Sequence, residues 1–197
     1  MLPGRTMAQT SEVARVEALA AERQASQRRH LWRVGAWGSL NLLGGAALML
    51  ASDRQRQPTR RGFGLQAGLW GAVNLSIAGF GLLSSSSDPT SSYGEVVSAE
   101  RGYHDILLLN MGLNVAYAAM GTAMVVAGYR DVRSAASWRG HGLALILQGA
   151  GLLVLDGISL VASRSRLGDL LGPDFVGVAG GLSGMAFPGG VSVVIPL

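Results

Sequence analysis

Two stretches decide the fold of this chain: RGFGLQAGLWGAVNLSIAGFGLLSS at residues 61–85 and RGHGLALILQGAGLLVLDGISLVAS at residues 139–163. Both are apolar or small nearly all the way round, and each is long enough to supply the roughly 20 residues with which a helix crosses about 30 Å of hydrocarbon. They align without a gap at an offset of 78 residues, and the identities include Arg61/Arg139, Gly62/Gly140, Gly64/Gly142, Leu65/Leu143, Gly71/Gly149, Ala72/Ala150 and Gly79/Gly157. The sequence therefore predicts two related membrane-spanning helices.

Charged residues are rare and are confined to particular segments. Only 14% of the 197 residues are charged, against about 25% in an ordinary soluble domain, and 49% are hydrophobic. A soluble four-helix bundle would show a polar face on every helix, and the uncharged stretches show none. The pattern predicts an all-α membrane protein with four spans, at residues 31–51, 63–84, 104–128 and 140–162.

The four spans are predicted to be two copies of one helical hairpin. The first and third spans match more loosely, through Leu40-Asn41 and Leu113-Asn114. Both copies enter from the same side, so the repeats are parallel and related by an axis near the membrane normal. Small residues in the second span are interpreted as a surface for close helix packing, with a flexible gating helix as the alternative; they are Gly64, Gly68, Ala72 and Ser76.

The arginines predict the orientation. Connections 53–61 and 130–139 carry seven arginines, whereas connection 84–103 is rich in serine and acidic residues. The positive-inside rule places the two Arg-rich connections in the cytoplasm and both termini in the periplasm of a bacterial inner membrane. Five arginines before residue 30 run against this orientation. Aromatic residues at the predicted span ends fit the two interfaces; they are Trp32, Tyr103, Tyr129 and Trp138.

Amide side chains lie near the middle of every predicted span. They are Asn41, Asn74, Asn114 and Gln148, with Asn110 one turn before Asn114. Because an unpaired amide is costly in hydrocarbon, these side chains are predicted to face inward and to hydrogen-bond across the bundle. We interpret this midplane polar layer as a clasp that sets helix register. A midplane site for a small substrate or ion is the alternative.

Ionisable side chains gather at the opposite side from the Arg-rich connections. Those at the start of the first span are Arg29, His30 and Arg33, those at the start of the third are Arg101, His104 and Asp105, and Asp156 lies near the end of the fourth. A carboxylate inside the membrane is a functional candidate, and we predict that Arg33 or His104 pairs with Asp156 and locks the fourth span. The alternatives are a proton relay or metal site through His30, His104 and Asp156, and a pigment or haem ligand at any of the three histidines.

Catalytic motifs are missing from the chain. It has no Cys, so it has no disulfide, thiolate ligand or Cys nucleophile, and it has no Lys, so it has no P-loop. Residues 181–184 begin like G-x-S-x-G, but Met185 replaces the final Gly. We predict no enzyme, no resident cofactor beyond the pigment or haem alternative, no metal site beyond the alternative at Asp156, and no nucleic-acid partner.

The two ends differ from the bundle at residues 31–163. Within residues 1–30, positions 10–29 predict an amphipathic helix that lies on the membrane, on a partner or on its own bundle, and no apolar signal-peptide core is evident. Residues 164–197 form an apolar, Gly-rich tail that is predicted to be extended or a β-hairpin, with a fifth span as the alternative. We predict that the tail docks on a partner chain through Phe175, Phe187, Val191, Val193 and Ile195.

The chain resembles an uncharacterised group of small membrane proteins from Gram-negative bacteria over residues 12–163. The matching segments are RHLWR (29–33) leading into WGSLN (37–41), LWGAVNLSIAGFG (69–81), LNMGLNVAY (109–117) and GHGLALILQGAGLLVLD (140–156). The resemblance implies four spans and no particular activity. Members of the group often begin with a cleavable signal, and this chain departs from that pattern.

Two function classes follow from these features. The first is a structural or accessory subunit of a larger membrane complex of respiratory or photosynthetic type, whose partners are the lipid bilayer and other membrane subunits. The second is a small transporter or channel with a midplane polar site. The lack of catalytic motifs and the packing-rich helices favour the first, whereas the midplane amides, Asp156 and the duplicated hairpin favour the second.

Overall fold

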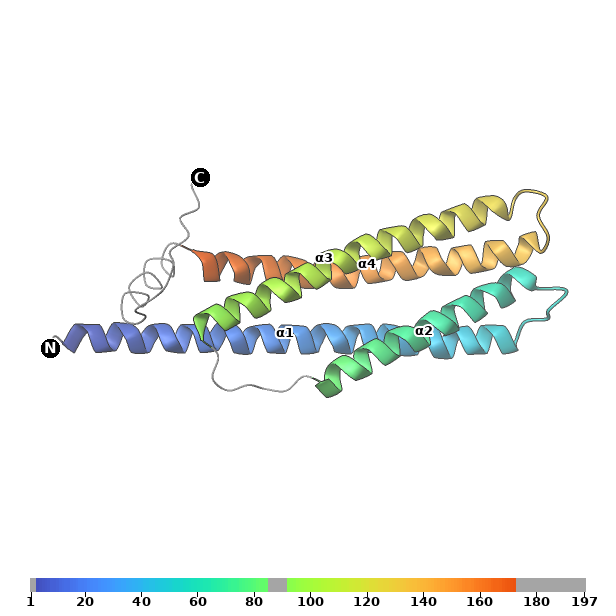
Figure 1. Cartoon of the computed structure of the whole chain (residues 1–197). Coiled ribbons are helices and arrows are strands. Elements are labelled where there is room, and N and C mark those ends of the chain that lie inside the picture. Colours follow the sequence, from blue (N-terminus) through green and yellow to red (C-terminus); the bar gives the residue numbers. More distant parts are fainter. Residues whose placement is uncertain (1–2, 85–91, 173–197) are drawn as a thin grey trace.

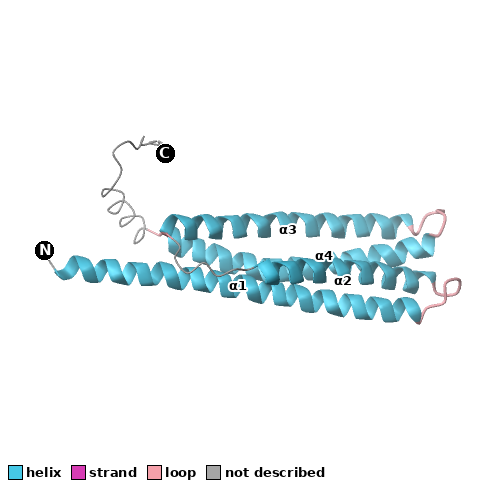
Figure 2. Cartoon of the chain, turned by 60° about the horizontal axis from the view of Figure 1, so that its bottom comes forward, coloured by secondary structure: helices cyan, strands magenta, loops and turns pink. Residues whose placement is uncertain are grey.

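The computed structural model describes the chain over residues 3–84 and 92–172. These residues form four helices, α1 (Pro3–Leu50), α2 (Pro58–Ser84), α3 (Tyr93–Ala127) and α4 (Ala135–Leu171), in an elongated bundle (Figure 1). Figure 2 shows no strand in this part of the chain. The prediction of an all-helical protein with four long helices is confirmed. The predicted extended or β-hairpin tail and its five contact residues lie outside the described residues.

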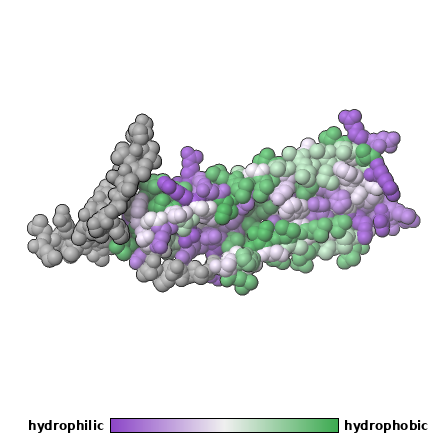
Figure 3. All heavy atoms as spheres, viewed as in Figure 1, coloured by the Kyte–Doolittle hydropathy of each residue, from purple (hydrophilic) through white to green (hydrophobic). Residues whose placement is uncertain are grey.

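Three of the helices have the properties of membrane spans. By length and composition α2, α3 and α4 are each apolar enough to cross a membrane. Figure 3 shows apolar side chains over the middle of the bundle and hydrophilic side chains at the end that holds the two short connections. These findings are consistent with a membrane protein.

The α3 helix begins at Tyr93, well before the predicted residue 104. A capping box starts it: the Ser92 hydroxyl accepts from the Glu95 N–H, and the Glu95 carboxylate accepts from the Ser92 N–H at 2.7 Å. This S-x-x-E motif satisfies two backbone donors that the end of a helix leaves open. The motif was overlooked in the sequence, and the segment was therefore assigned to a connection.

The α1 and α4 helices are also longer than predicted. Positions 10–29 and 31–51 were expected to be separate helices, but α1 is continuous from Pro3 because no proline interrupts it. The α4 helix runs nine residues past residue 162 and ends at Leu171, just before Gly172 and Pro173. The boundaries predicted at residues 30 and 163 therefore fall inside helices.

Three helices extend beyond α2 at one end of the bundle. Figure 1 shows α2 ending short of its neighbours there, at the end opposite the two short connections. We call this part the polar extension, and it comprises residues 13–29 of α1, 93–103 of α3 and 163–171 of α4. Both Arg-rich connections therefore lie at one end of the molecule, as predicted, and the polar extension lies at the other.

The bundle is assembled from two hairpins that meet through α2 and α4. The α1 helix packs along α2 and α3 packs along α4, whereas α2 and α3 scarcely touch. Their contact includes the rings of Trp70 and Tyr117, whose centroids are 4.6 Å apart. The α4 helix is the central element, since it packs along α3, packs against α2 of the other hairpin and also contacts α1.

The contact between α2 and α4 is reciprocal. A Cβ at Gly62 would lie 2.9 Å from the Ser137 carbonyl oxygen, and a Cβ at Gly140 would meet the Thr59 carbonyl oxygen and lie 2.8 Å from the Phe63 nitrogen. Gly140 and Ser137 stand 78 residues after Gly62 and Thr59, the offset of the sequence repeat. Equivalent residues exchange equivalent contacts, as expected of parallel repeats related by a two-fold axis.

The predicted small-residue row on α2 faces α1 only in part. Cβ atoms at Gly64 and Gly71 would run into the α1 backbone, and Gly68 lies in ordinary van der Waals contact with it. Ala72 and Ser76 instead point outward, so their predicted packing role is wrong. A row spaced by four residues drifts about 40° per step around a helix of 3.6 residues per turn, and the contact therefore moves from position 72 to position 71.

Candidate functional site

The inner face of α4 carries a line of buried polar side chains. We call it the polar column, and its members are Gln148, Asp156, Ser159, Ser163 and Arg166. They span about 27 Å at 1.5 Å per residue. Each is at most 4% exposed. Buried polar groups require partners, so the neighbours of the column determine what it can do.

Asp156 is the central group of the column. Its Oδ1 lies 3.1 Å from His30 Nε2 on α1, and its Oδ2 accepts a hydrogen bond of 2.6 Å from Asn114 Nδ2 on α3. The Asp156 carboxylate therefore ties α4 to two other helices, and both of its oxygens are occupied.

The second nitrogen of His30 is also occupied. His30 Nδ1 lies 2.9 Å from the Ser159 hydroxyl, which also lies 3.3 Å from the Leu155 carbonyl oxygen. Ser159 can donate to His30 when the ring is neutral, or accept from His30 and donate to Leu155 when the ring is protonated. The site therefore satisfies its hydrogen bonds in either state of the ring, and no ring nitrogen of His30 is open to a haem, pigment or metal.

The structure overturns the predicted partners of Asp156. Arg33 and Asp105 are exposed, and His104 is half-buried with an Nδ1 that makes no hydrogen bond to a described residue. His30 takes their place because it lies on the buried face of α1, whereas Arg33 is rotated by about 60° from it. Among the described residues, no group of three His, Cys, Asp or Glu side chains could hold a metal ion.

The predicted midplane layer is present in part. Asn74 Nδ2 donates to Gln148 Oε1 at 3.3 Å and so joins α2 to α4. The same oxygen accepts a bond of 2.9 Å from the Trp37 indole N–H, which joins α1 to them. Asn41 bonds within its own helix to the Trp37 carbonyl oxygen at 2.8 Å, and half-buried Asn110 makes no side-chain hydrogen bond to a described residue. Trp37 is the member of this layer that the sequence interpretation missed.

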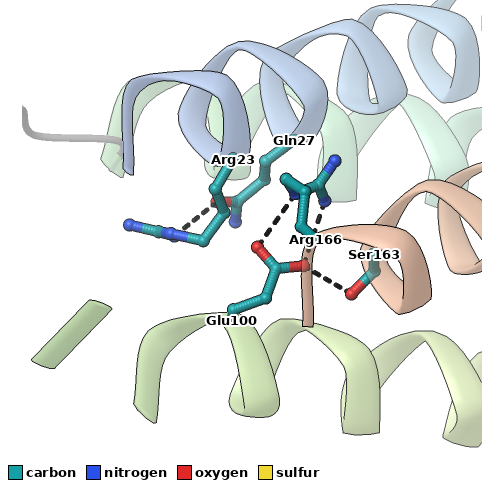
Figure 4. Close-up of polar contacts among 5 residues, drawn as sticks. All are labelled: Arg23, Gln27, Glu100, Ser163 and Arg166. Carbon is teal, nitrogen blue, oxygen red and sulfur yellow. Dashed lines mark hydrogen bonds and ion pairs between the residues drawn. The ribbon is translucent and has the colours of Figure 1, made fainter. Parts of the chain in front are cut away.

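A second carboxylate is buried in the polar extension. Glu100 is fully buried and forms a bidentate pair with Arg166, through Nε at 3.1 Å and Nη2 at 3.0 Å (Figure 4). The Ser163 hydroxyl donates to Glu100 Oε1 at 2.5 Å. Figure 4 places Arg23 and Gln27 of α1 beside the pair, and Arg23 Nη1 donates to Gln27 Oε1 at 3.4 Å. This cluster was not predicted, because residues 100 and 166 were assigned to segments outside the helices.

Tyr103 lies between the two carboxylate sites. It is buried one turn along α3 from Glu100, and its hydroxyl lies within electrostatic range of Asp156, Glu100 and Arg166. The hydroxyl makes no hydrogen bond of normal geometry to a described residue. The polar column and its neighbours thus form one continuous polar region from the polar extension to Asp156.

Comparison with known proteins identifies a family but no activity. A family model described as "Family of unknown function (DUF6992)" matches residues 33–157, more than half of the chain. No curated protein matches the chain, and no solved structure does. The expectation of an uncharacterised family is confirmed. The matched segment includes Asp156, Asn114, Glu100 and Gln148, but not His30 or Arg166.

Proposed function

This chain belongs to DUF6992, a family of unknown function, and from its own contacts we propose that it is a structural or accessory subunit of a larger membrane protein complex. The observation that carries the proposal is that both buried carboxylates of the described residues are held within the chain. Asp156 is held by His30 and Asn114, and Glu100 by Arg166 and Ser163. A carboxylate that is paired within the chain holds its helices in a fixed arrangement. A subunit that packs against other subunits of a complex requires such a fixed arrangement.

The glycine contacts favour the same proposal. Backbone atoms of neighbouring helices meet at Gly38 and Gly71 in one hairpin and at Gly121 and Gly149 in the other. Lipid tails provide no hydrophobic drive for helices to associate, so this close packing is what holds the bundle together. Many large apolar side chains are exposed on the outside of the bundle, where lipid or partner helices cover them.

The proposal includes a placement in the membrane. We propose that α1 is the fourth span, because its residues 34–50 carry no charge and Gly35, Gly38 and Gly45 pack along α2. The Arg-rich connections then lie in the cytoplasm, and the polar extension lies in the periplasm beside a bacterial inner membrane.

Cysteine labelling tests this placement. The chain contains no cysteine, and both Gln57, in the first connection, and Ser165, in the polar extension, are exposed. In intact spheroplasts, Ser165→Cys is expected to react with a membrane-impermeant maleimide, whereas Gln57→Cys reacts only after the membrane is opened. Labelling of both variants from the same face would contradict the four-span placement.

Purification in mild detergent tests the accessory function. We expect the chain to co-purify with other membrane subunits at constant stoichiometry. Deletion of residues 174–197, which contain the proposed attachment at Phe175, Phe187 and 191–195, is expected to leave the bundle in the membrane and release it from the complex. A stable homo-oligomer without other subunits would contradict the proposal, and full co-purification of the truncated chain would remove the tail as the attachment.

The second candidate is a small transporter or channel. The observation that favours it is the continuous polar region from the polar extension to Asp156, since intramembrane carboxylates commonly mark ion or proton pathways. In this alternative His30 and Asp156 exchange a proton during transport.

The Asp156→Asn variant discriminates the two candidates. If Asp156 is a structural lock, the variant should still assemble but lose about 1–3 kcal/mol of stability, because the amide cannot accept from both His30 and Asn114 as a charged group does. Thermal unfolding in detergent measures the loss, and Asp105→Asn at an exposed position is the matched control. Unchanged stability with loss of proton-coupled uptake in proteoliposomes would favour the transporter.

A further inference from the structure

The end of the bundle that holds the two short connections carries the net positive charge of the chain. Residues 53–61 and 130–139 contain seven arginines and two aspartates, a net charge of +5, whereas the rest of the chain contains nine arginines and ten acidic residues, a net charge of −1. We call this part the arginine end. Figure 3 shows its hydrophilic side chains directly beside the apolar middle of the bundle.

Two arginines of this end have structural roles. Arg61 donates to the carbonyl oxygen of Met49 at 3.0 Å, where α1 ends, and Arg139 donates to the carbonyl oxygen of Gly128 at 2.6 Å, where α3 ends. These positions are equivalent in the repeat, so each hairpin uses the same arginine to cap its first helix. Arg139 also lies over the ring of Tyr129, 5.1 Å from its centroid.

The other five arginines are exposed and make no ion pair with another residue of the described chain; they are Arg54, Arg56, Arg60, Arg130 and Arg133. Asp53 does not neutralise them by direct pairing, because its carboxylate accepts from the N–H groups of Arg56 and Gln55 in its own turn. These backbone bonds hold the pKa of Asp53 below its usual value. Five guanidinium groups are therefore free to bind anions.

The setting of these arginines indicates which anion they bind. Two aromatic side chains at the same end, Tyr129 and Trp138, are exposed, as is typical of residues at the level of lipid headgroups. A guanidinium group presents a planar fork of donors that matches phosphate oxygens. We propose that the arginine end binds the headgroups of anionic phospholipids. This inference rests on the proposed placement of the bundle in a membrane, and it does not depend on the accessory function.

Tryptophan fluorescence tests the proposal at both ends of one molecule. Trp138 lies at the arginine end and Trp32 lies at the opposite predicted interface, and both are exposed. The Trp32→Phe variant keeps Trp138 as its interfacial reporter, and the Trp138→Phe variant keeps Trp32. Each is reconstituted in bilayers that contain brominated phosphatidylglycerol or brominated phosphatidylcholine, and Trp37 and Trp70 contribute equally to both variants.

For each reporter we compare the quenching by brominated phosphatidylglycerol with the quenching by brominated phosphatidylcholine. We expect this quenching ratio to be severalfold higher with Trp138 than with Trp32. The excess should shrink in high salt, because exposed charges are screened. It should disappear when the five free arginines become glutamine. It should persist when five exposed arginines of the other end become glutamine instead; these are Arg28, Arg29, Arg33, Arg101 and Arg164.

Circular dichroism and melting establish that both sets of variants keep the helical fold. Equal quenching ratios at the two reporters would overturn the proposal, as would an excess that survives the five substitutions at the arginine end.

Discussion

Alanine in place of Gly149 is expected to force α3 and α4 apart and to lower the stability of the bundle by about 1–3 kcal/mol, the range measured for overpacked cores. A Cβ at this position would lie 2.5 Å from the Asn114 carbonyl oxygen and 3.0 Å from the Ala118 nitrogen. Both atoms belong to the backbone of α3, which cannot rotate away as a flexible side chain can. The hydrogen bond from Asn114 to Asp156 should weaken with the same displacement.

The same helix offers a matched control for this substitution. Gly157→Ala adds the same methyl group where no atom lies within 4 Å, so it should stabilise α4 by about 0.5–1 kcal/mol through helix propensity. Thermal unfolding followed by circular dichroism in detergent compares the two variants. If Gly149→Ala melts at the same temperature as Gly157→Ala, the close approach of α3 and α4 is not what holds this hairpin together.

The glycines also show how far the fold can be predicted from the sequence. The repeat correctly paired Gly62 with Gly140 and Gly71 with Gly149, and all four lie at close helix contacts. The alignment could not predict which helix each one faces. The helix that a small residue faces depends on the angle at which the helices cross. In α2 this geometry places Gly71, rather than Ala72, at the contact with α1. The spacing therefore predicts that a helix packs through small residues, but not which of these residues lie at the contact.

The candidate site was predicted less completely than the fold. Asp156 and His30 were both identified as members of one ionisable cluster, and the structure brings them together. Their direct pairing was missed, because Arg33 or His104 was predicted as the partner of Asp156. The position of a residue around the α1 helix determines whether it can pair with Asp156. His30 lies on the buried face of α1, and Arg33 does not.

The second expected result concerns the pair that joins α3 to α4 in the polar extension. Arg166→Gln should destabilise this end of the molecule by about 3–5 kcal/mol, because it leaves the fully buried Glu100 without a cation. The neighbouring Arg164 is exposed and makes no ion pair with another residue of the described chain, so Arg164→Gln should have an effect near zero. Hydrogen exchange of the α3 and α4 amides in residues 93–103 and 163–171 measures the loss locally.

The double variant Glu100→Gln, Arg166→Gln separates the charge from the packing. Two neutral amides of similar size can hydrogen-bond to each other, so removing both charges should recover most of the stability that the single substitution loses. If the double variant is as unstable as Arg166→Gln alone, the arginine acts through its packed side chain rather than through its charge. If it is as stable as the original chain, then the ion pair serves mainly to set the register of α3 on α4, because a pair that adds no net stability still excludes arrangements in which Glu100 is buried alone.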